Sequence, residues 1–509
     1  MTERGHKEFP LLFQVGLVFF GVVLIILVEG LLRISTAPAP ACQEDPFVGF
    51  AGKDPFFIRA EKHGRAIYQI NPKRAGFFNP SSFPARKSGN AFRIFVLGGS
   101  VAMGFPFHEP GSFSRFLAIG LSKLDKSKTY EVVNVGGFGY ASYRVVRILR
   151  EVINHDPDLI IVMSGHNEFL EKRTYGEIEA QSPALVALKT RLAGFRIYCL
   201  LKTGVFKIRG PDARPLLASE VTWEKYVRDP VQVERTIRHY EYNIQEMTRI
   251  SRHGNVPILF LTLPCNLREF PPYYSRHDDT LSETEMEKWN RFYKKGLEGI
   301  ERGELDQALS WLALAEEIDP DYADLQFRIG RVLWHKKEWD KAREKFWTAV
   351  RTDARPMRVF PEMNQMIRSQ ARGRGVLLAD AERDFSDNST GRIPGDDWFL
   401  DHCHPDLHGH IAMARTIITS MINARIIQPA PDWHDVYDKA CENYQKSLPD
   451  YWLAGAYYRA AFETGLNVKR LNRGIRLAEI AKKLDPENPK ISGLIQTLTH
   501  LKETTETRE

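Results

Sequence analysis

Arg93-Ile-Phe-Val-Leu-Gly-Gly-Ser-Val-Ala-Met-Gly104 is the stretch that decides the fold of this chain. Its apolar run Ile94–Leu97 ends abruptly in two glycines, which predicts a buried strand followed by a tight turn. Ser100 then lies at the carboxyl end of that strand. Ligands of open α/β sheets bind outside the carboxyl ends of the strands, so a nucleophile is expected there. Taken alone, Gly-Gly-Ser is also ordinary turn chemistry.

The chain after this stretch alternates between apolar strands and amphipathic helices. Such alternation predicts an α/β fold with a doubly wound parallel sheet. The expected strands are 94–97, 130–135, 159–163, 257–263 and 375–379, and the expected helices are 113–124, 143–153 and 231–252. Residues 170–216 are interpreted as an insertion that contains a helix at 183–202.

A second pattern, with a period of 34 residues, occupies 289–356. Three positions of its first helix pair recur in the second: Ala308, Leu312 and Ala315 match Ala342, Phe346 and Ala349. Gly296 and Gly330 match at the same offset. The segment is similar to the tetratricopeptide (TPR) repeat, although Leu312 stands where an aromatic residue is usual and Ala354 replaces the closing proline. Two unrelated amphipathic helix pairs are the alternative.

The order of these patterns predicts the domain organisation. A strand returns at 375–379, so the repeats are expected to be inserted within the α/β domain. After residue 430 small apolar positions predict a degenerate further repeat that completes the stack. The expected boundaries are a tail at 1–8, a transmembrane helix at 9–32, a linker and irregular lead-in at 33–90, the α/β domain at 91–270, TPR repeats at 271–360, the closing part of the α/β domain at 361–428 and a TPR-like helical segment at 429–509.

The N-terminal run 9–28 is uncharged and apolar. As a helix rising about 1.5 Å per residue it would reach roughly 30 Å, which is one hydrocarbon thickness. The run predicts a single-pass anchor rather than a cleaved signal peptide, because the candidate cleavage site Ala39-Pro-Ala41 comes late and contains proline. With either interpretation the bulk of the chain is expected outside the cytoplasm. The charge evidence for this orientation is small: Arg4 and Lys7 precede the run and Arg33 follows it.

Composition argues against several classes of partner. The net charge of +6 is small for 509 residues and no basic run of five or more occurs, so nucleic acid is not an expected partner. The cysteines are odd in number and contain no CxxC, so neither a disulfide framework nor a zinc cage is expected. They are Cys42, Cys199, Cys265, Cys403 and Cys441. No cofactor is expected.

Four short motifs fall in order at expected strand ends. They are Gly98-Gly99-Ser100, Asn134-Val-Gly136-Gly137-Phe-Gly139, Ser164-Gly165-His166-Asn167-Glu168 and Asp401-His402-Cys403-His404. As an ordered set they resemble the SGNH (GDSL-type) hydrolases over residues 91–270 and 370–425. The resemblance implies a flavodoxin-like sheet and ester chemistry through an acyl-serine intermediate. The first motif departs from the family, where many members have Gly-Asp-Ser.

Carried over position by position, the resemblance implies a catalytic triad. Ser100 would be the nucleophile, His404 its general base and Asp401 the group that orients the imidazole. A separation of three residues in one loop lets the Asp401 carboxylate fold back onto His404. A serine hydroxyl is a poor nucleophile at neutral pH without such a base.

The same resemblance implies an oxyanion hole. Its donors would be the backbone N–H groups of Ser100 and Gly139 and the side-chain amide of Asn167. Gly137 is an alternative to Gly139 in another reading of the second motif.

Other interpretations of these residues stay open. Asp401 and His404 could join His402, His408 and His410 in a zinc site, but no second cluster supplies ligands, so no metal is expected. Cys403 is expected to be a packing residue. Arg268, in the loop before the repeats, is a candidate for contacting an anionic substrate or else a solvated or salt-bridged arginine.

Together these observations predict a membrane-anchored, extracytoplasmic serine hydrolase that cleaves or transfers an O-acyl ester. An acylated envelope glycan is the expected substrate class by family analogy alone. The alternative is a scaffold in which the TPR repeats bind a protein partner and the hydrolase domain is secondary or acts as an O-acyltransferase.

Overall fold

The computed structural model describes residues 11–34, 55–72, 76–169, 195–198 and 229–506. The chain divides into two compact units: Met1–Pro55 with Arg173–Val221, and Phe56–Lys172 with Thr222–Glu509. The helix expected over 183–202 and its surrounding insertion lie mostly outside the described residues.

In the first unit, α1 (Leu11–Ile34) is a helix of 24 residues. Over the residues whose backbone and side chains are described, no helix is long and apolar enough to cross a membrane.

The second unit is built on a five-stranded sheet with the order β5-β4-β6-β7-β8, in which every neighbouring pair is parallel. The strands are β4 (Ala91–Gly98), β5 (Thr129–Gly136), β6 (Leu159–Met163), β7 (Ile258–Leu261) and β8 (Val376–Ala379). Counted along the chain, this order is 2-1-3-4-5, the flavodoxin-like form of a doubly wound sheet. The expected parallel α/β sheet is confirmed, and all five expected strands are present.

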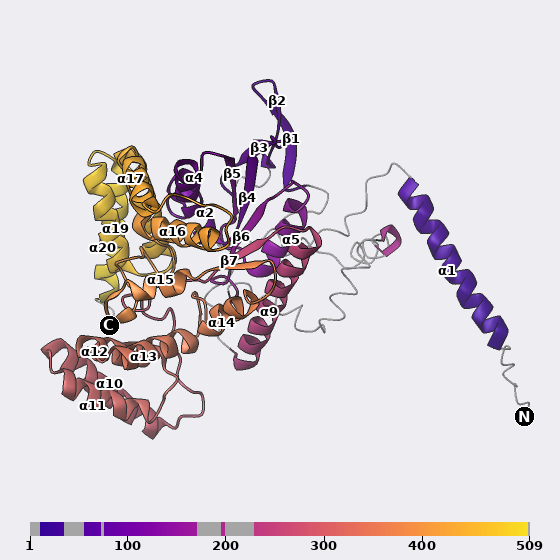
Figure 1. The fold of residues 1–509 in the computed structure, drawn as a ribbon. Helices are drawn as coiled ribbons and strands as arrows, with labels where there is room; N and C mark the ends of the chain where they lie inside the picture. The colour runs from indigo at the N-terminus through magenta and orange to yellow at the C-terminus, as the bar shows by residue number, and fades with distance from the viewer. Residues whose placement is uncertain (1–10, 35–54, 73–75, 170–194, 199–228, 507–509) are drawn as a thin grey trace, which may run out of the picture. The chain divides into compact units, whose positions relative to one another are not determined.

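Helices cover both faces of the parallel sheet (Figure 1). One face carries α4 (Phe113–Leu124) and α16 (Leu407–Asn423), and the other carries α5 (Ser142–Val152), α9 (Pro230–His253) and α14 (Pro361–Gln370). Because both faces are covered, strands such as β6 are buried along their whole length and lack polar alternation.

The described part of the lead-in, from residue 55 to 72 and from 76 to 90, contains three strands, so the expectation of an irregular segment was wrong there. The strands form an antiparallel sheet of β1 (Phe57–Lys62), β2 (Arg65–Ile70) and β3 (Ser82–Pro84). The β1–β2 turn consists of His63 and Gly64, with φ of 51° and 71°. A two-residue hairpin turn of this kind needs positive φ at both positions. The sheet is held to the α/β core by aromatic packing, for example Phe83 against Phe95 at 5.2 Å between ring centroids.

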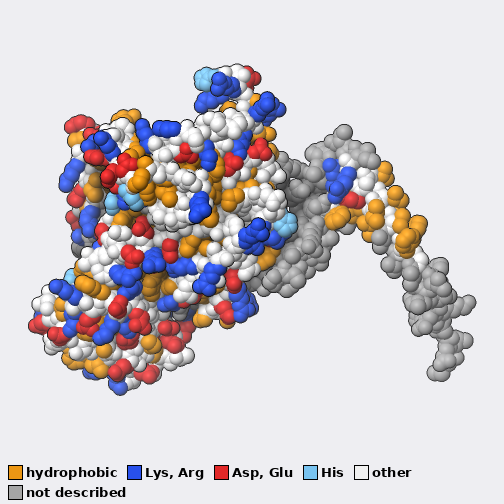
Figure 2. Space-filling model, viewed as in Figure 1, with side chains coloured by type: hydrophobic (Ala, Val, Ile, Leu, Met, Phe, Trp, Pro, Cys, Tyr) orange, Lys and Arg blue, Asp and Glu red, His pale blue; other side chains and the backbone are white. Residues whose placement is uncertain are grey.

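Two helix pairs lie between β7 and β8: α10 (Glu283–Arg302) with α11 (Leu305–Glu316), and α12 (Ala323–His335) with α13 (Trp339–Thr352). Their packing has the 34-residue period of the sequence. A Cβ at Gly296 would fall 2.4 Å from Leu312, and one at Gly330 would fall 2.9 Å from the equivalent Phe346. Acidic and basic side chains intermingle on the surface of these helices (Figure 2).

The C-terminal helices are α17 (Trp433–Lys446), α18 (Asp450–Phe462), α19 (Leu471–Leu484) and α20 (Pro489–Glu506). They were expected to complete the stack of repeats. Instead, α17 packs on α4, and α18–α20 enclose an apolar cluster that includes Phe107 and Leu400 of the α/β domain. The segment therefore packs against the α/β domain beside the loop that precedes α16.

Candidate active site

The sheet order brings the motifs of the sequence to one edge. Ser100 begins the short helix α2 (Ser100–Met103) directly after β4, and Asn167 follows β6. Asp401 and His404 lie on the loop before α16. Since β4 is flanked by β5 and β6, the strand order reverses here, and this reversal is where open α/β sheets form their ligand crevice.

Ser100, His404 and Asp401 form a continuous chain of hydrogen bonds. Ser100 Oγ lies 2.8 Å from His404 Nε2, and His404 Nδ1 lies 2.6 Å from Asp401 Oδ2. Serine and histidine are 304 residues apart in the sequence, so only the fold unites them. All three residues are at least nine-tenths buried. Distances of this size suit transfer of the serine proton to the imidazole.

The Asp401 carboxylate also organises its own loop. Its Oδ1 accepts the backbone N–H groups of Cys403 (2.9 Å) and His404 (2.8 Å). Burial would raise the pKa of this carboxyl, but the neighbouring His404 and His402 and these hydrogen bonds hold the pKa well below its usual range. Asp401 is therefore an anion fixed against the imidazole.

Unpaired donors gather beside Ser100. Among the described residues, the backbone N–H groups of Ser100 and Gly139 have no acceptor. Asn167 Nδ2 gives one hydrogen to the Tyr140 carbonyl at 3.1 Å, which leaves its second N–H free. The N–H of Gly137 already donates to the Gly98 carbonyl at 3.0 Å. Gly139 rather than Gly137 can therefore serve as a donor to a ligand.

Gly139 has a φ of +72°, which side chains rarely allow, and a Cβ there would meet nothing within 4 Å. Glycine is therefore favoured at this position by its backbone conformation and not by crowding from neighbouring atoms.

Several residues at the site were not found by sequence reasoning. The Phe105 ring packs on the His404 imidazole at 4.7 Å between centroids. The fully buried Glu168 carboxylate accepts the backbone N–H and the hydroxyl of Ser142 at 2.7 and 2.8 Å, which ties the loop after Asn167 to the start of α5. Glu168 was quoted as the last residue of the third motif but was given no role, and the only sequence signal for Phe105 is that it lies five residues after Ser100.

The other histidines of the cluster have separate environments. His410 is fully buried with both ring nitrogens unpartnered, and burial lowers its pKa to about 3. His408 stacks on Trp398 at 4.7 Å. His402 lies 3.4 Å from Asp401 Oδ1, but burial lowers its pKa to about 4, so it stays neutral near pH 7.

Potential metal-ligand atoms of Asp401, His402, Cys403 and His404 lie within 4.8 Å of one another. Their bonding does not fit a zinc site. The two oxygens of Asp401 already bind the backbone of its own loop and the His404 ring, and the other ring nitrogen of His404 is bonded to Ser100. These four side chains fit the serine–histidine arrangement better.

Arg268 is not joined to the triad. Its guanidinium bonds to the carboxylates of Glu269 and Asp397, the latter at 3.0 Å, and stacks on Trp334 of α12 at 5.0 Å. The residue is 8% exposed. Of the two interpretations of Arg268, the structure therefore shows the salt-bridged arginine, which links α12 to the loop after β7.

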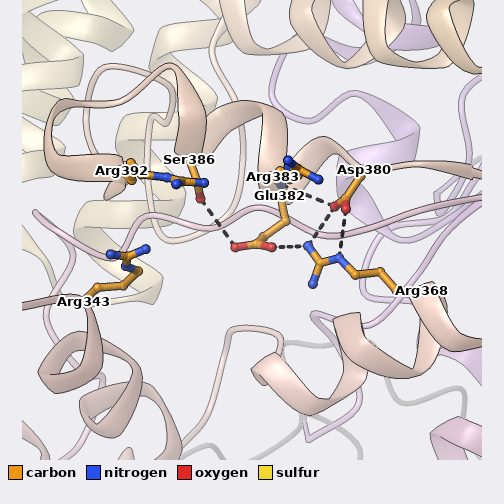
Figure 3. Close-up of a pocket in the computed structure, with 7 residues that line it drawn as sticks. All are labelled: Arg343, Arg368, Asp380, Glu382, Arg383, Ser386 and Arg392. Carbon is orange, nitrogen blue, oxygen red and sulfur yellow. Dashed lines mark hydrogen bonds and ion pairs between the residues drawn. The ribbon is translucent and has the colours of Figure 1, made fainter. Parts of the chain in front are cut away.

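A surface hollow of about 250 Å³ lies elsewhere in this unit and contains no residue of the triad (Figure 3). Arg368 dominates it, with bonds of 2.9 and 2.8 Å to Asp380 and a further bond to Glu382. Arg343 of α13 faces this network from the repeats. The ion pairs of Arg368 with Asp380 and Glu382 lie within the α/β domain, whereas Arg343 pairs with Asp340 of its own helix.

Comparisons with known proteins give structural likeness only. No protein-family model and no curated protein matches the chain. An α/β hydrolase from the metagenome of Lake Arreo, Spain, is 12% identical with a TM-score of 0.30, covering 66% of this chain and 96% of its own. A GDSL-like lipase from Bacteroides thetaiotaomicron is 12% identical with a TM-score of 0.28, covering 65% and 88%. An extracellular lipase from Streptomyces rimosus is 10% identical with a TM-score of 0.26, covering 65% and 100%.

Proposed function

We propose that this protein is a serine hydrolase that acts on ester bonds, with Ser100 as nucleophile. The single observation that carries the proposal is the buried chain Ser100 Oγ–His404–Asp401, with links of 2.8 and 2.6 Å. Its order and geometry are those of the Ser-His-Asp triad, which recurs on unrelated folds and is recognised by geometry.

The reaction follows from the positions of these groups. His404 Nε2 takes the Ser100 proton as Oγ attacks the ester carbonyl carbon, and Asp401 stabilises the imidazolium that forms. When the tetrahedral intermediate collapses, the C–O bond to the leaving alcohol breaks and His404 donates the proton to that alcohol. An acyl-serine remains. Water, activated by His404 in the same way, attacks the acyl-serine and releases the acid and free Ser100.

The negative charge on the carbonyl oxygen needs donors at the moment of attack. The free N–H groups of Ser100 and Gly139 and the second N–H of the Asn167 amide are available for it. Two of these donors are backbone N–H groups and the third is a buried side-chain amide, so the donors need to move little when the oxyanion forms. Donors of this kind each contribute roughly 10²–10³ in rate.

The cellular location of the protein and its substrate class are proposed from the sequence. The apolar run 9–28 would tether the enzyme to a membrane with the hydrolase outside the cytoplasm, where an acylated envelope glycan is the proposed substrate. Side chains such as Phe19, Ile26 and Leu31 of α1 are more than half exposed, and lipid would cover such a surface favourably (Figure 2). Protease added to intact cells should degrade the chain beyond residue 55 without lysis; protection until lysis would refute this location.

A hydroxyl acceptor in place of water would make the same site an O-acyltransferase. The acyl-serine and all three triad residues would be common to both reactions. Release of free acid compared with transfer to added oligosaccharide separates the two. The repeats α10–α13 are proposed as a surface for a protein partner on their similarity to TPR repeats alone.

The activity is tested on the purified full-length chain with detergent present, using a short-chain aryl ester. Ser100→Ala and His404→Ala are each expected to lower kcat by at least about 10³-fold while circular dichroism and the melting temperature stay near wild type. Hydrolysis by wild type that persists in Ser100→Ala would exclude this site as its source. Absence of any hydrolysis across acyl lengths by folded wild type would reject the ester-hydrolase proposal.

A further inference from the structure

The loop that carries Asp401 and His404 is held from outside by the C-terminal helices. Arg473, in the first turn of α19, is 9% exposed and reaches the two residues that precede Asp401. Its Nη2 donates to the Phe399 carbonyl at 2.9 Å, and its Nε donates to the Leu400 carbonyl. Leu400 is bonded covalently to Asp401, so one guanidinium fixes the peptide on which the triad carboxylate stands.

Two N–H groups of the loop bond elsewhere: Leu400 donates to the His404 carbonyl at 2.9 Å and Asp406 donates to the Trp398 carbonyl at 2.9 Å. The carbonyls of Phe399 and Leu400 are instead bonded by Arg473, which belongs to another element. A planar guanidinium offers several N–H groups in a fixed fork, whereas a lysine offers one point charge.

The charge of Arg473 is balanced within the same network. Its Nη1 lies 2.5 Å from Asp396 Oδ1. That carboxylate also accepts the Asn266 side chain at 2.9 Å, and the Asn266 backbone N–H donates to the His402 carbonyl at 3.0 Å. Arg473 thus joins α19, the loop after β7 and the loop that contains both Asp401 and His404.

The backbone around Arg473 is closely packed against η5. Its neighbour Gly474 lies backbone to backbone against Gly465 of η5 (Glu463–Asn467), where a Cβ at Gly474 would fall 2.6 Å from the Gly465 Cα. Arg470 donates its N–H to the Thr464 carbonyl at 2.9 Å. The start of α19 therefore has little freedom to shift relative to η5.

We propose that Arg473 is a positioning residue of the triad, and that the C-terminal helices α18–α20 are part of the catalytic unit and not a separate binding module. The predicted effect of Arg473 on kcat rests on the proposed ester-hydrolase function. The predicted effect of Arg473 on the order of the loop at 399–404 does not depend on which reaction the protein catalyses.

The test compares Arg473→Ala and Arg473→Lys with Arg476→Ala in the full-length chain. Arg476 is a matched control because it lies on the same helix and reaches the other oxygen of Asp396 at 3.6 Å, but its side chain is 64% exposed and binds neither carbonyl. The readouts are kcat and KM for the aryl ester, and hydrogen exchange of peptides that cover 396–406.

For Arg473→Ala, kcat should fall by about 10- to 100-fold with KM changed less than about threefold, since a small displacement of a catalytic group costs this much. Exchange at 399–404 should quicken. Arg473→Lys should recover part of kcat, and Arg476→Ala should match wild type in both readouts. If Arg473→Ala fails to fold, Arg473→Lys decides, because it keeps the charge but loses the planar fork of the guanidinium; its kcat should lie below that of wild type and its exchange at 399–404 should be faster.

A folded Arg473→Ala with kcat within twofold of wild type and unchanged exchange overturns the proposal. Equal losses in Arg476→Ala overturn it too, because a general effect of charge would then explain both. If wild type has no activity, the ester-hydrolase function fails by itself, and the exchange of 399–404 alone decides whether Arg473 orders the loop.

Discussion

A side chain at position 99 would collide with the amide of Asn167: a Cβ built on Gly99 falls 2.5 Å from Asn167 Nδ2 and 3.2 Å from the Tyr140 carbonyl oxygen. Gly99 therefore packs directly against the Asn167 side-chain amide, which is a candidate donor to an oxyanion. The Gly-Gly-Ser motif of this chain, which differs from the Gly-Asp-Ser of the family it resembles, is matched to the position of Asn167.

Gly99→Ala is therefore expected to displace the Asn167 amide. The prediction is a fall in kcat of about 10- to 100-fold with little change in KM, because a donor that acts in the transition state is misplaced. Steady-state kinetics on the aryl ester measure it. Gly493→Ala is the control, since a Cβ at Gly493 meets nothing within 4 Å and the residue lies on α20. Wild-type kcat in Gly99→Ala would show that the Asn167 amide is not used.

Asn167→Ala removes the donor outright. It should lower kcat by about 10²–10³-fold, the usual cost of one oxyanion donor, while labelling of Ser100 by a fluorophosphonate persists at a reduced rate. The rate of labelling and kcat are measured in parallel. A loss confined to KM would mean that Asn167 binds ground-state substrate and does not stabilise the oxyanion.

Cys403 lies between the triad residues in sequence but is expected to have no chemical part. It is 2% exposed, and burial raises its pKa well above the usual thiol value, so thiolate is scarce at neutral pH. Cys403→Ala should keep kcat within about threefold and lower the stability by about 1 kcal/mol through lost packing. Native protein should also resist iodoacetamide at Cys403. Loss of turnover beyond 100-fold in a folded variant would contradict this assignment.

The ionised state of Asp401 gives a pH test. Its folded pKa lies below that of an unfolded aspartate, near 3.9, so its contribution to stability is present above about pH 4 and is lost as the pH falls further. The melting-temperature difference between wild type and Asp401→Asn should therefore shrink from pH 6 to pH 3. A difference that stays constant or widens would contradict an anionic Asp401 in the fold.

The sheet was predictable from the sequence because buried parallel strands are continuous apolar runs. Ser100 and Asn167 follow two of these strands, whose ends meet at one sheet edge, but the pairing of Asp401 and His404 with Ser100 was implied only by the resemblance to the SGNH hydrolases. The hairpin of β1 and β2 was missed because its signal, the two residues His63 and Gly64, is short and its strands lack clean alternation. The stacking of the C-terminal helices was wrongly predicted, since small apolar positions define helix pairs but not the surface that they pack against.

Arg473 had no local signal at all. Its partners Phe399 and Leu400 are 74 and 73 residues away, and they bind through backbone carbonyls, which every residue type possesses. Residues that act by holding another segment's backbone are therefore visible only in the folded chain. The choice between Gly139 and Gly137 as an oxyanion donor is likewise visible only in the folded chain. It depends on a backbone hydrogen bond, which occupies the N–H of Gly137 and leaves the N–H of Gly139 free.

The most direct test of the central claim is the site of covalent modification. The full-length chain would be treated with a fluorophosphonate and its mass and peptides measured, with His404→Ala and Cys403→Ala in parallel. The account predicts one adduct per chain on Ser100, greatly slowed in His404→Ala and unchanged in Cys403→Ala. An adduct on another residue, or a folded wild-type protein that takes up none, would contradict the assignment of Ser100 as an activated nucleophile.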